Sequence, residues 1–133
     1  MTVAYWLLKT EPSTYSFEDL EREKATRWDG VRNNTALQHI RTMKPGDQAI
    51  IYHSGDVRAA IGIAEITTET YVDPDGSDNR WAVVDLRATR RLAEPVTLTT
   101  IKADPLFAES PLVRISRLSV VPLTPEQFRA LTG

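Results

Sequence analysis

The sequence predicts a single α+β domain that spans residues 1–133 and forms a small, partly closed β-barrel flanked by short helices. Apolar residues follow a helical spacing before Lys44, whereas after Gln48 they alternate with polar residues as in β-strands. No repeat or linker interrupts the chain, and a domain of 133 residues buries about two-thirds of its extended surface, enough for one core. Because about five strands must protect their edges in so small a domain, partial closure into a barrel is favoured.

The first half of the chain is expected to contain one strand and two helices. A short apolar run at 4–8 indicates a buried strand. Ser16 and Asp19 have the spacing of a capping box, which predicts a helix over 17–23, and a turn is expected at 28–31. Asn33 or Asn34 can cap a second helix, whose apolar residues fall on one face: Ala36, Leu37, Ile40 and Met43.

The second half is expected to consist mainly of strands. Four β-rich segments are predicted at 48–53, 59–67, 80–89 and 118–122. Gly62 interrupts the second of them and suits a sharp bend or bulge. The polar segment 73–79 is predicted to be a mobile hairpin tip. A short helix is predicted over 97–102, and Thr124 with Gln127 forms a capping box that begins a terminal helix.

The composition disfavours several classes of function. The 16 basic and 18 acidic residues leave a net charge of −2, which argues against coating of DNA through bulk charge but permits a local basic groove. With no cysteine and two histidines, we expect no disulfide, thiolate nucleophile, metal site or cofactor. No apolar run approaches about 20 residues and no signal peptide opens the chain, so we expect a cytoplasmic protein without a membrane span.

Three segments combine aromatic residues with hydrogen-bonding residues where packing alone would favour aliphatic ones. They are 5–13, 28–33 and 52–54. This combination suits a planar heterocycle, because rings stack on its faces and polar groups bind its edge. Each tryptophan could equally be a core residue whose indole N–H finds a partner. The arginines around 80–91 form either a solvated face or a rim that follows phosphates.

Four ordered motifs give the chain a resemblance to the EVE domain family: YWLLKTEP at 5–12, YSFEDL at 15–20, WDGVRN at 28–33 and YHS at 52–54. The resemblance covers essentially the whole chain. It implies a PUA-like fold, similar to the YTH and ASCH domains, and a pocket of aromatic residues that takes a modified base, with modified cytosine in DNA as the implied ligand. The chain departs from the family at two positions. Leu37 stands where an arginine is usual, and Ile51 stands where a phenylalanine is common.

We therefore expect a non-catalytic domain that binds a modified base, such as 5-methylcytosine, in DNA rather than RNA, and that acts as a monomer. The predicted base pocket comprises Trp6, Ser13, Trp28, Asn33, Tyr52, His53 and Ser54. The predicted contacts to phosphates are Lys9, Arg32, Arg87 and Arg91. Four of the pocket residues are expected to line one concavity: Trp28, Asn33, Tyr52 and Ser54.

Two other functions are compatible with the sequence. The first is a small hydrolase of the ASCH-like type, acting on a modified nucleoside or RNA, with Lys9, Glu11 and His53 as an acid–base set. The second is a module that binds another protein and has no role with nucleic acid. A change in substrate mass would identify the hydrolase, whereas loss of oligonucleotide binding on charge reversal of Arg87 and Arg91 would exclude the interaction module.

Overall fold

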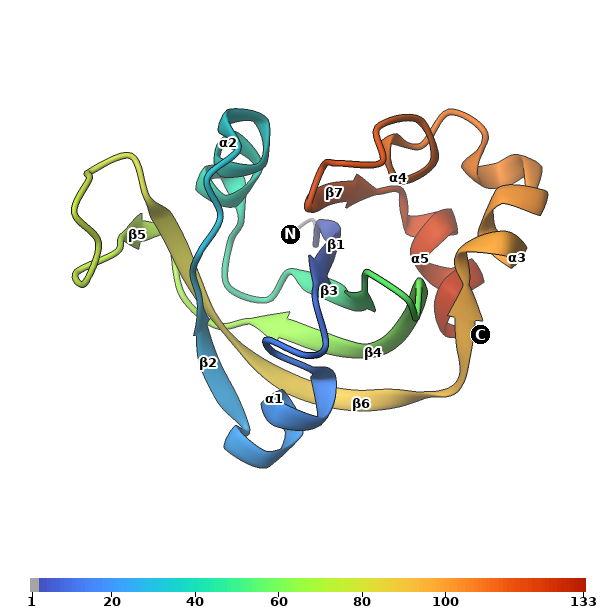
Figure 1. The fold of residues 1–133 in the computed structure, drawn as a ribbon, viewed down its shortest axis with the longest axis horizontal. Helices are drawn as coiled ribbons and strands as arrows, with labels where there is room; N and C mark the ends of the chain where they lie inside the picture. Colours follow the sequence, from blue (N-terminus) through green and yellow to red (C-terminus); the bar gives the residue numbers. More distant parts are fainter. Residues whose placement is uncertain (1–2) are drawn as a thin grey trace.

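The computed structural model describes residues 3–133, in which seven strands form a curved mixed sheet (Figure 1). The strands are β1 (Tyr5–Thr10), β2 (Ala25–Trp28), β3 (Gln48–His53), β4 (Ala59–Ile66), β5 (Tyr71–Val72), β6 (Ala82–Thr97) and β7 (Val120–Leu123). Their order is β2-β6-β4-β3-β1-β7, and β5 pairs with β6. Strands β1 and β3 run parallel, and the other pairs are antiparallel.

Short helices cover the sheet and complete the core. They are α1 (Phe17–Glu23), α2 (Asn34–Thr42), α3 (Leu98–Ala103), the 3₁₀ turn Pro105–Phe107, α4 (Pro111–Arg114) and α5 (Pro125–Thr132). Helix α2 packs against both β7 and β6, which are far apart in the strand order, so it fills the gap that the curved sheet leaves open. Helices α3, α4 and α5 gather at one end of the molecule (Figure 1). The α+β class is confirmed, although the sheet itself does not close.

Helix ends lie where the sequence predicts them. The Ser16 side chain accepts the Asp19 N–H, and the Asp19 side chain accepts the Ser16 N–H. Thr124 and Gln127 form the same reciprocal pair at the start of α5. Asn33 caps α2 by accepting the Ala36 N–H at 3.0 Å. Each cap satisfies backbone donors that no helical hydrogen bond can reach.

β6 and β2 depart most from the predictions, and the two-residue strand β5 was not predicted either. β6 is 16 residues long instead of ending near residue 89, and its pairing with β4 shifts register on either side of Gly62. The bulge expected at Gly62 is therefore confirmed, and a Cβ there would overlap the Phe17 ring. β2 was not predicted, and Trp28, expected to begin a turn, is instead the last residue of this strand and pairs with Val84 of β6. Only this distant partner makes the short, mostly polar segment a strand.

The segment 73–79 is anchored at several points. Arg27 of β2 donates to Asp73 at 3.1 Å and to Asp75 at 2.7 Å. Two guanidinium groups contact the Trp81 ring: that of Arg32 lies 4.3 Å from the ring centre and that of Arg80 lies 5.1 Å from it. The hairpin predicted as a mobile tip is thus tied to β2 and to the segment before α2.

Candidate functional site

Two hollows meet at Lys9, near the C-terminal end of β1. Because β1 and β3 are parallel and in register, Lys9 and Tyr52 are direct neighbours, and the Lys9 Nζ lies 5.8 Å from the centre of the Tyr52 ring. Lys9 lines both hollows. We name them the Trp28 cleft and the Tyr52 pocket.

The Trp28 cleft has a volume of about 490 Å³. It is lined by Lys9, Thr10, Glu11, Thr14, Tyr15, Thr26, Arg27, Trp28, Asp29 and Gly30. The end of β1, the turn after it and the end of β2 supply these residues. Two aromatic rings, two carboxylates, two cations and three threonines therefore surround one opening.

The aromatic pair in this cleft is held in place by hydrogen bonds. The Tyr15 and Trp28 rings meet edge to face, with centres 6.1 Å apart. The Tyr15 hydroxyl donates to Glu23 at 2.6 Å, and burial together with this bond raises the pKa of Tyr15 to about 12. The Thr10 hydroxyl donates to the Tyr15 carbonyl at 2.6 Å. These bonds fix the Tyr15 ring, which packs edge to face against Trp28.

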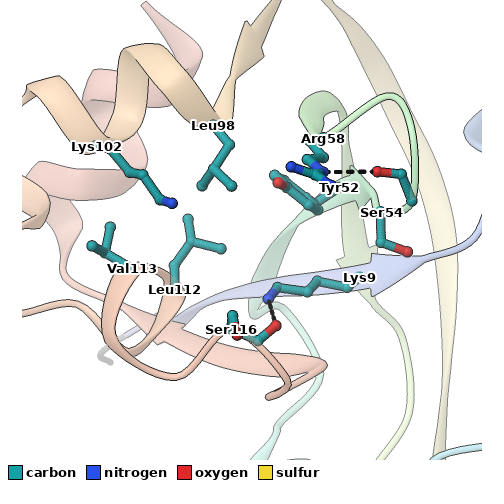
Figure 2. Close-up of a pocket in the computed structure, with 10 residues that line it drawn as sticks. Lys9, Tyr52, Ser54, Arg58, Leu98, Lys102, Leu112, Val113 and Ser116 are labelled. Carbon is teal, nitrogen blue, oxygen red and sulfur yellow. Dashed lines mark hydrogen bonds between the residues drawn. The ribbon is translucent and has the colours of Figure 1, made fainter.

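The Tyr52 pocket lies on the other side of Lys9 and has a volume of about 360 Å³ (Figure 2). It is lined by Lys9, Tyr52, Ser54, Gly55, Arg58, Leu98, Lys102, Leu112, Val113 and Ser116. The Lys9 ammonium donates to the Ser116 carbonyl at 2.9 Å, and the Arg58 Nε donates to the Gly55 carbonyl at 3.0 Å. Burial lowers the pKa of Lys9 and raises that of Tyr52.

Gly55 and Glu11 connect the two hollows. Glu11 lines the Trp28 cleft, and its carboxylate packs over Gly55 of the Tyr52 pocket so closely that a Cβ on Gly55 would overlap it. Gly55 also has φ +76°, a left-handed conformation that favours glycine. The position of the acidic group in one hollow therefore depends on the turn that forms the other.

The structure brings four predicted site residues to these hollows: Lys9, Trp28, Tyr52 and Ser54. They do not share the single concavity that the sequence predicted, because Lys9 stands between Trp28 on one side and Tyr52 with Ser54 on the other. Asn33 lines neither hollow among those described, and its side-chain oxygen is used to cap α2.

Trp6 and His53 are committed to the core. The Trp6 indole N–H donates to buried Asp47 at 3.1 Å. Trp6 is therefore a core residue whose indole has a partner, which is the alternative to a base-binding role. His53 accepts the Phe17 N–H on Nε2 at 3.0 Å. Burial and the nearby Arg91 lower the pKa of His53. Its acceptor nitrogen therefore holds α1 and does not support the acid–base role of the hydrolase alternative.

Four further predicted residues line neither of the two hollows in the described chain: Ser13, Arg32, Arg87 and Arg91. Arg32 stacks on the ring that anchors segment 73–79. Arg87 pairs with Glu65 at 2.8 Å, and Arg91 pairs with Glu21. Arg87 and Arg91 are thus paired with carboxylates, whereas Lys9 and Arg58 of the Tyr52 pocket donate to backbone carbonyls.

Sequence reasoning missed several residues that line the hollows. Tyr15 lies within a motif that had been noticed, but its ring was not assigned to the site. Arg58 and Lys102 reach the Tyr52 pocket from the turn before β4 and from α3, and α4 adds Leu112. The only signal for them was their charge or apolar character, which does not specify a partner so distant in the chain.

Within residues 3–133, the structure contains no helix long and apolar enough to cross a membrane. In the same part of the chain, no three histidine or acidic side chains are arranged to hold a metal ion. The cytoplasmic location expected from the sequence stays a prediction.

Comparison with known proteins identifies relatives along the whole domain. Thymocyte nuclear protein 1 of Gallus gallus is 33% identical over an alignment that covers 96% of this chain and 67% of the relative. A protein from Rhodopseudomonas palustris has 41% identity and a TM-score of 0.91, with 98% of this chain and 91% of that chain covered. Human THYN1, solved in complex with DNA that contains 5-methylcytosine, has 29% identity and a TM-score of 0.81, with 97% and 95% covered. A family model described as the EVE domain matches residues 4–133, so this chain belongs to the EVE domain family.

Proposed function

We propose that this EVE domain binds DNA carrying a modified cytosine, without converting it, and that the Trp28 cleft takes the base. The observation that carries the proposal is the likeness to human THYN1, whose structure contains DNA with 5-methylcytosine, together with a cleft of suitable size and chemistry at Trp28. The similarity to an ASCH protein of Zymomonas mobilis is 15% identity at a TM-score of 0.60, and it supports a shared fold only.

The polar groups of the cleft match the edge of a cytosine. The exocyclic amino group of cytosine is a donor, and acidic side chains accept from it. Glu11 and Asp29 both line the cleft and supply such acceptors, while the Lys9 ammonium supplies a donor for the ring carbonyl. The arrangement therefore offers both kinds of hydrogen bond that a cytosine edge requires.

The rings of the cleft supply the apolar contact. Trp28 is 7% exposed, so it presents part of a ring to the cleft instead of an open face, and Tyr15 adds a second edge. Contact between a base and aromatic rings contributes about 1–3 kcal/mol. An added methyl group in a fitted apolar recess contributes about 1–3 kcal/mol more, which corresponds to roughly tenfold discrimination or better.

Access to the cleft requires a base that has left its stack. Extrusion from a duplex costs a few kcal/mol, so single-stranded DNA or a flipped nucleotide is the expected ligand and unmodified duplex is expected to bind weakly. In this proposal Tyr52 and Ser54 lie beside the bound nucleotide, and Trp6 and His53 support the walls. Arg32, Arg87 and Arg91 would contact phosphates of a longer DNA strand only by exchanging the partners that they have in this structure.

Anisotropy titrations with short single-stranded oligonucleotides test this proposal. The oligonucleotides are identical except for one central cytosine, 5-methylcytosine or 5-hydroxymethylcytosine. We expect a modified base to bind about tenfold more tightly than cytosine, with one protein per oligonucleotide. Equal affinity for all three would refute modified-base recognition, whereas a mass change in the oligonucleotide after incubation would favour the hydrolase.

The Trp28→Phe variant tests whether the preference for the modified base arises in the Trp28 cleft. Trp6→Phe is the matched control. Both replacements keep an aromatic ring and remove an indole. We expect the first to reduce the preference for the modified base and the second to leave that preference unchanged, because the Trp6 indole bonds to Asp47 away from both hollows.

A further inference from the structure

The Tyr52 pocket has a concentration of cations that the binding of a base does not explain. Lys9, Arg58 and Lys102 reach it from β1, from the turn between β3 and β4, and from α3. Figure 2 shows their side chains directed toward the same hollow. Within residues 3–133, none of the three forms an ion pair with a carboxylate.

The lining of this pocket leaves the positive charge uncompensated. None of the ten described residues that line it is acidic. Two acidic residues line neighbouring hollows: Glu11 lines the Trp28 cleft and packs over Gly55, and Asp56 lines an adjacent hollow to which Arg58 and Lys102 also contribute. Within residues 3–133, neither carboxylate forms an ion pair with a cation of the Tyr52 pocket. Three cations around one hollow repel one another, and an anion bound among them would relieve that repulsion.

The opposite wall of the pocket is apolar. Leu98, Leu112 and Val113 form it, and Leu112 is almost fully buried. A site for a free inorganic anion needs no such wall, because all of its contacts are polar. A phosphate ester carries an organic group that apolar side chains can cover. The combination therefore favours a phosphate ester over a free inorganic anion.

We propose that the Tyr52 pocket is a second subsite, which holds the phosphate and adjoining nucleotide next to the modified base. Arg58 and Lys102 bind this phosphate together with Lys9, and the apolar wall packs against the neighbouring sugar or base. Lys9 lines both hollows, so one continuous strand can place its base in the Trp28 cleft and its next phosphate in the Tyr52 pocket. This inference rests on the proposed function, since it takes the base to occupy the Trp28 cleft.

Calorimetric titrations with small ligands test the subsite. The ligands are 5-methyldeoxycytidine, its 5′- and 3′-monophosphates, and the two dinucleotides in which thymidine precedes or follows the modified base. We expect one of the two monophosphates to bind on the order of tenfold more tightly than the nucleoside, the strength of a hydrogen-bonded charge pair. The dinucleotide extended on the same side should bind more tightly again.

Variants assign this gain to the cations of the pocket. Arg58→Gln and Lys102→Gln should each remove most of the difference between nucleoside and monophosphate while leaving the affinity for the nucleoside unchanged. Arg90→Gln is the matched control, because Arg90 is exposed, has no carboxylate partner in residues 3–133 and lines a different hollow on β6. If all three variants lost the same amount of this difference in affinity, net charge alone would account for it and the proposed subsite would be refuted.

Inorganic phosphate separates failure of this inference from failure of the proposed function. Titration followed by amide resonances should shift Gly55, Arg58 and Lys102 in the wild type and not in Lys102→Gln, even if the nucleoside does not bind. Shifts at the pocket with no selectivity for 5-methylcytosine would overturn the proposed function but keep the anion subsite. Shifts spread evenly over the basic residues of the protein, or none at all, would overturn the subsite.

Discussion

The Trp28 cleft and the Tyr52 pocket share Lys9 but are otherwise opposite in character. The cleft contains two carboxylates, two aromatic rings and Arg27, whereas the pocket contains no carboxylate, the Tyr52 ring, two further cations and an apolar wall. The cleft is formed by segments close together in the chain, at residues 9–15 and 26–30, and the pocket collects residues from 9 to 116.

This difference matches the two chemical ends of a nucleotide. A cytosine edge donates from its amino group, for which the cleft supplies acceptors, and a phosphate accepts, for which the pocket supplies donors. Selectivity is therefore expected to depend on the cleft, and salt-sensitive affinity on the pocket. Four predictions test that division, from the largest expected effect to the smallest.

The two buried tryptophans provide the strongest contrast, since each exposes 7% of its surface. Replacing either by alanine should lower the free energy of unfolding by about 3–5 kcal/mol, as for other large core residues. Only substitution at Trp28 should also change the ratio of affinities for modified and unmodified DNA. Chemical denaturation gives the first quantity, and titrations of the milder phenylalanine variants give the second. A changed ratio in Trp6→Phe would contradict the assignment of selectivity to the cleft.

Gly55→Ala should damage both hollows at once. The left-handed backbone at φ +76° makes alanine about 1–2 kcal/mol less stable, and the new Cβ must also displace the Glu11 carboxylate. Gly46→Ala is the matched control, because Gly46 has φ +94° but no atom within 4 Å of its Cβ position. We expect both variants to be destabilised and only Gly55→Ala to lose affinity for 5-methyldeoxycytidine. If Gly55→Ala bound the nucleoside as tightly as the wild type, Glu11 would not be one of the residues that contact the base.

The dependence of affinity on salt should distinguish free cations from paired ones. Lys102→Gln is expected to reduce the slope of log K against log salt for single-stranded DNA by about 0.7, the value of one lost phosphate contact. Arg91→Gln should reduce it less, since Arg91 is paired with Glu21. Titrations at several salt concentrations measure both slopes. A larger change of slope in Arg91→Gln would show that the DNA phosphates contact β6 instead of the Tyr52 pocket.

The smallest effect concerns His53, whose hydrogen bond to the Phe17 N–H links β3 to α1. Burial lowers the pKa of His53 from 6.5 in the folded state, so the unfolded chain binds a proton first as the pH falls. Its contribution to stability should be complete above pH 6.5 and be lost progressively below it. His53→Gln, which keeps an acceptor for the Phe17 N–H but cannot titrate, should lose less stability than the wild type between about pH 7 and 5. If urea unfolding showed the same loss of stability with falling pH in the wild type and in His53→Gln, a group other than His53 would cause it.

Much of the fold could be predicted because it depends on neighbours in the sequence. The capping pairs Ser16 with Asp19 and Thr124 with Gln127 are three residues apart, and both formed as expected. The full length of β6 could not be predicted in this way. It depends on pairing with β4 through two register shifts, and pairing between distant strands is not encoded locally.

The candidate site was predicted in part for the same reason. The aromatic and polar motifs identified Lys9, Trp28, Tyr52 and Ser54, which do lie at the two hollows. The same motifs also contain Trp6 and His53, which line neither hollow and bond instead to Asp47 and to the Phe17 N–H. Neighbours on a strand point to opposite faces, so a motif cannot reveal which of its residues face the core before the sheet is assembled.

By itself, the sequence determined the helices with their caps, most of the strands, and the aromatic and polar residues at the ends of β1, β2 and β3. Only the tertiary structure decided that Lys9 separates two hollows and that Arg58 and Lys102 join it in one of them. The physical reason is range: a helix cap is satisfied within one turn of chain, whereas a shared cluster of charges exists only after strand register and helix packing have brought residues 9, 58 and 102 together.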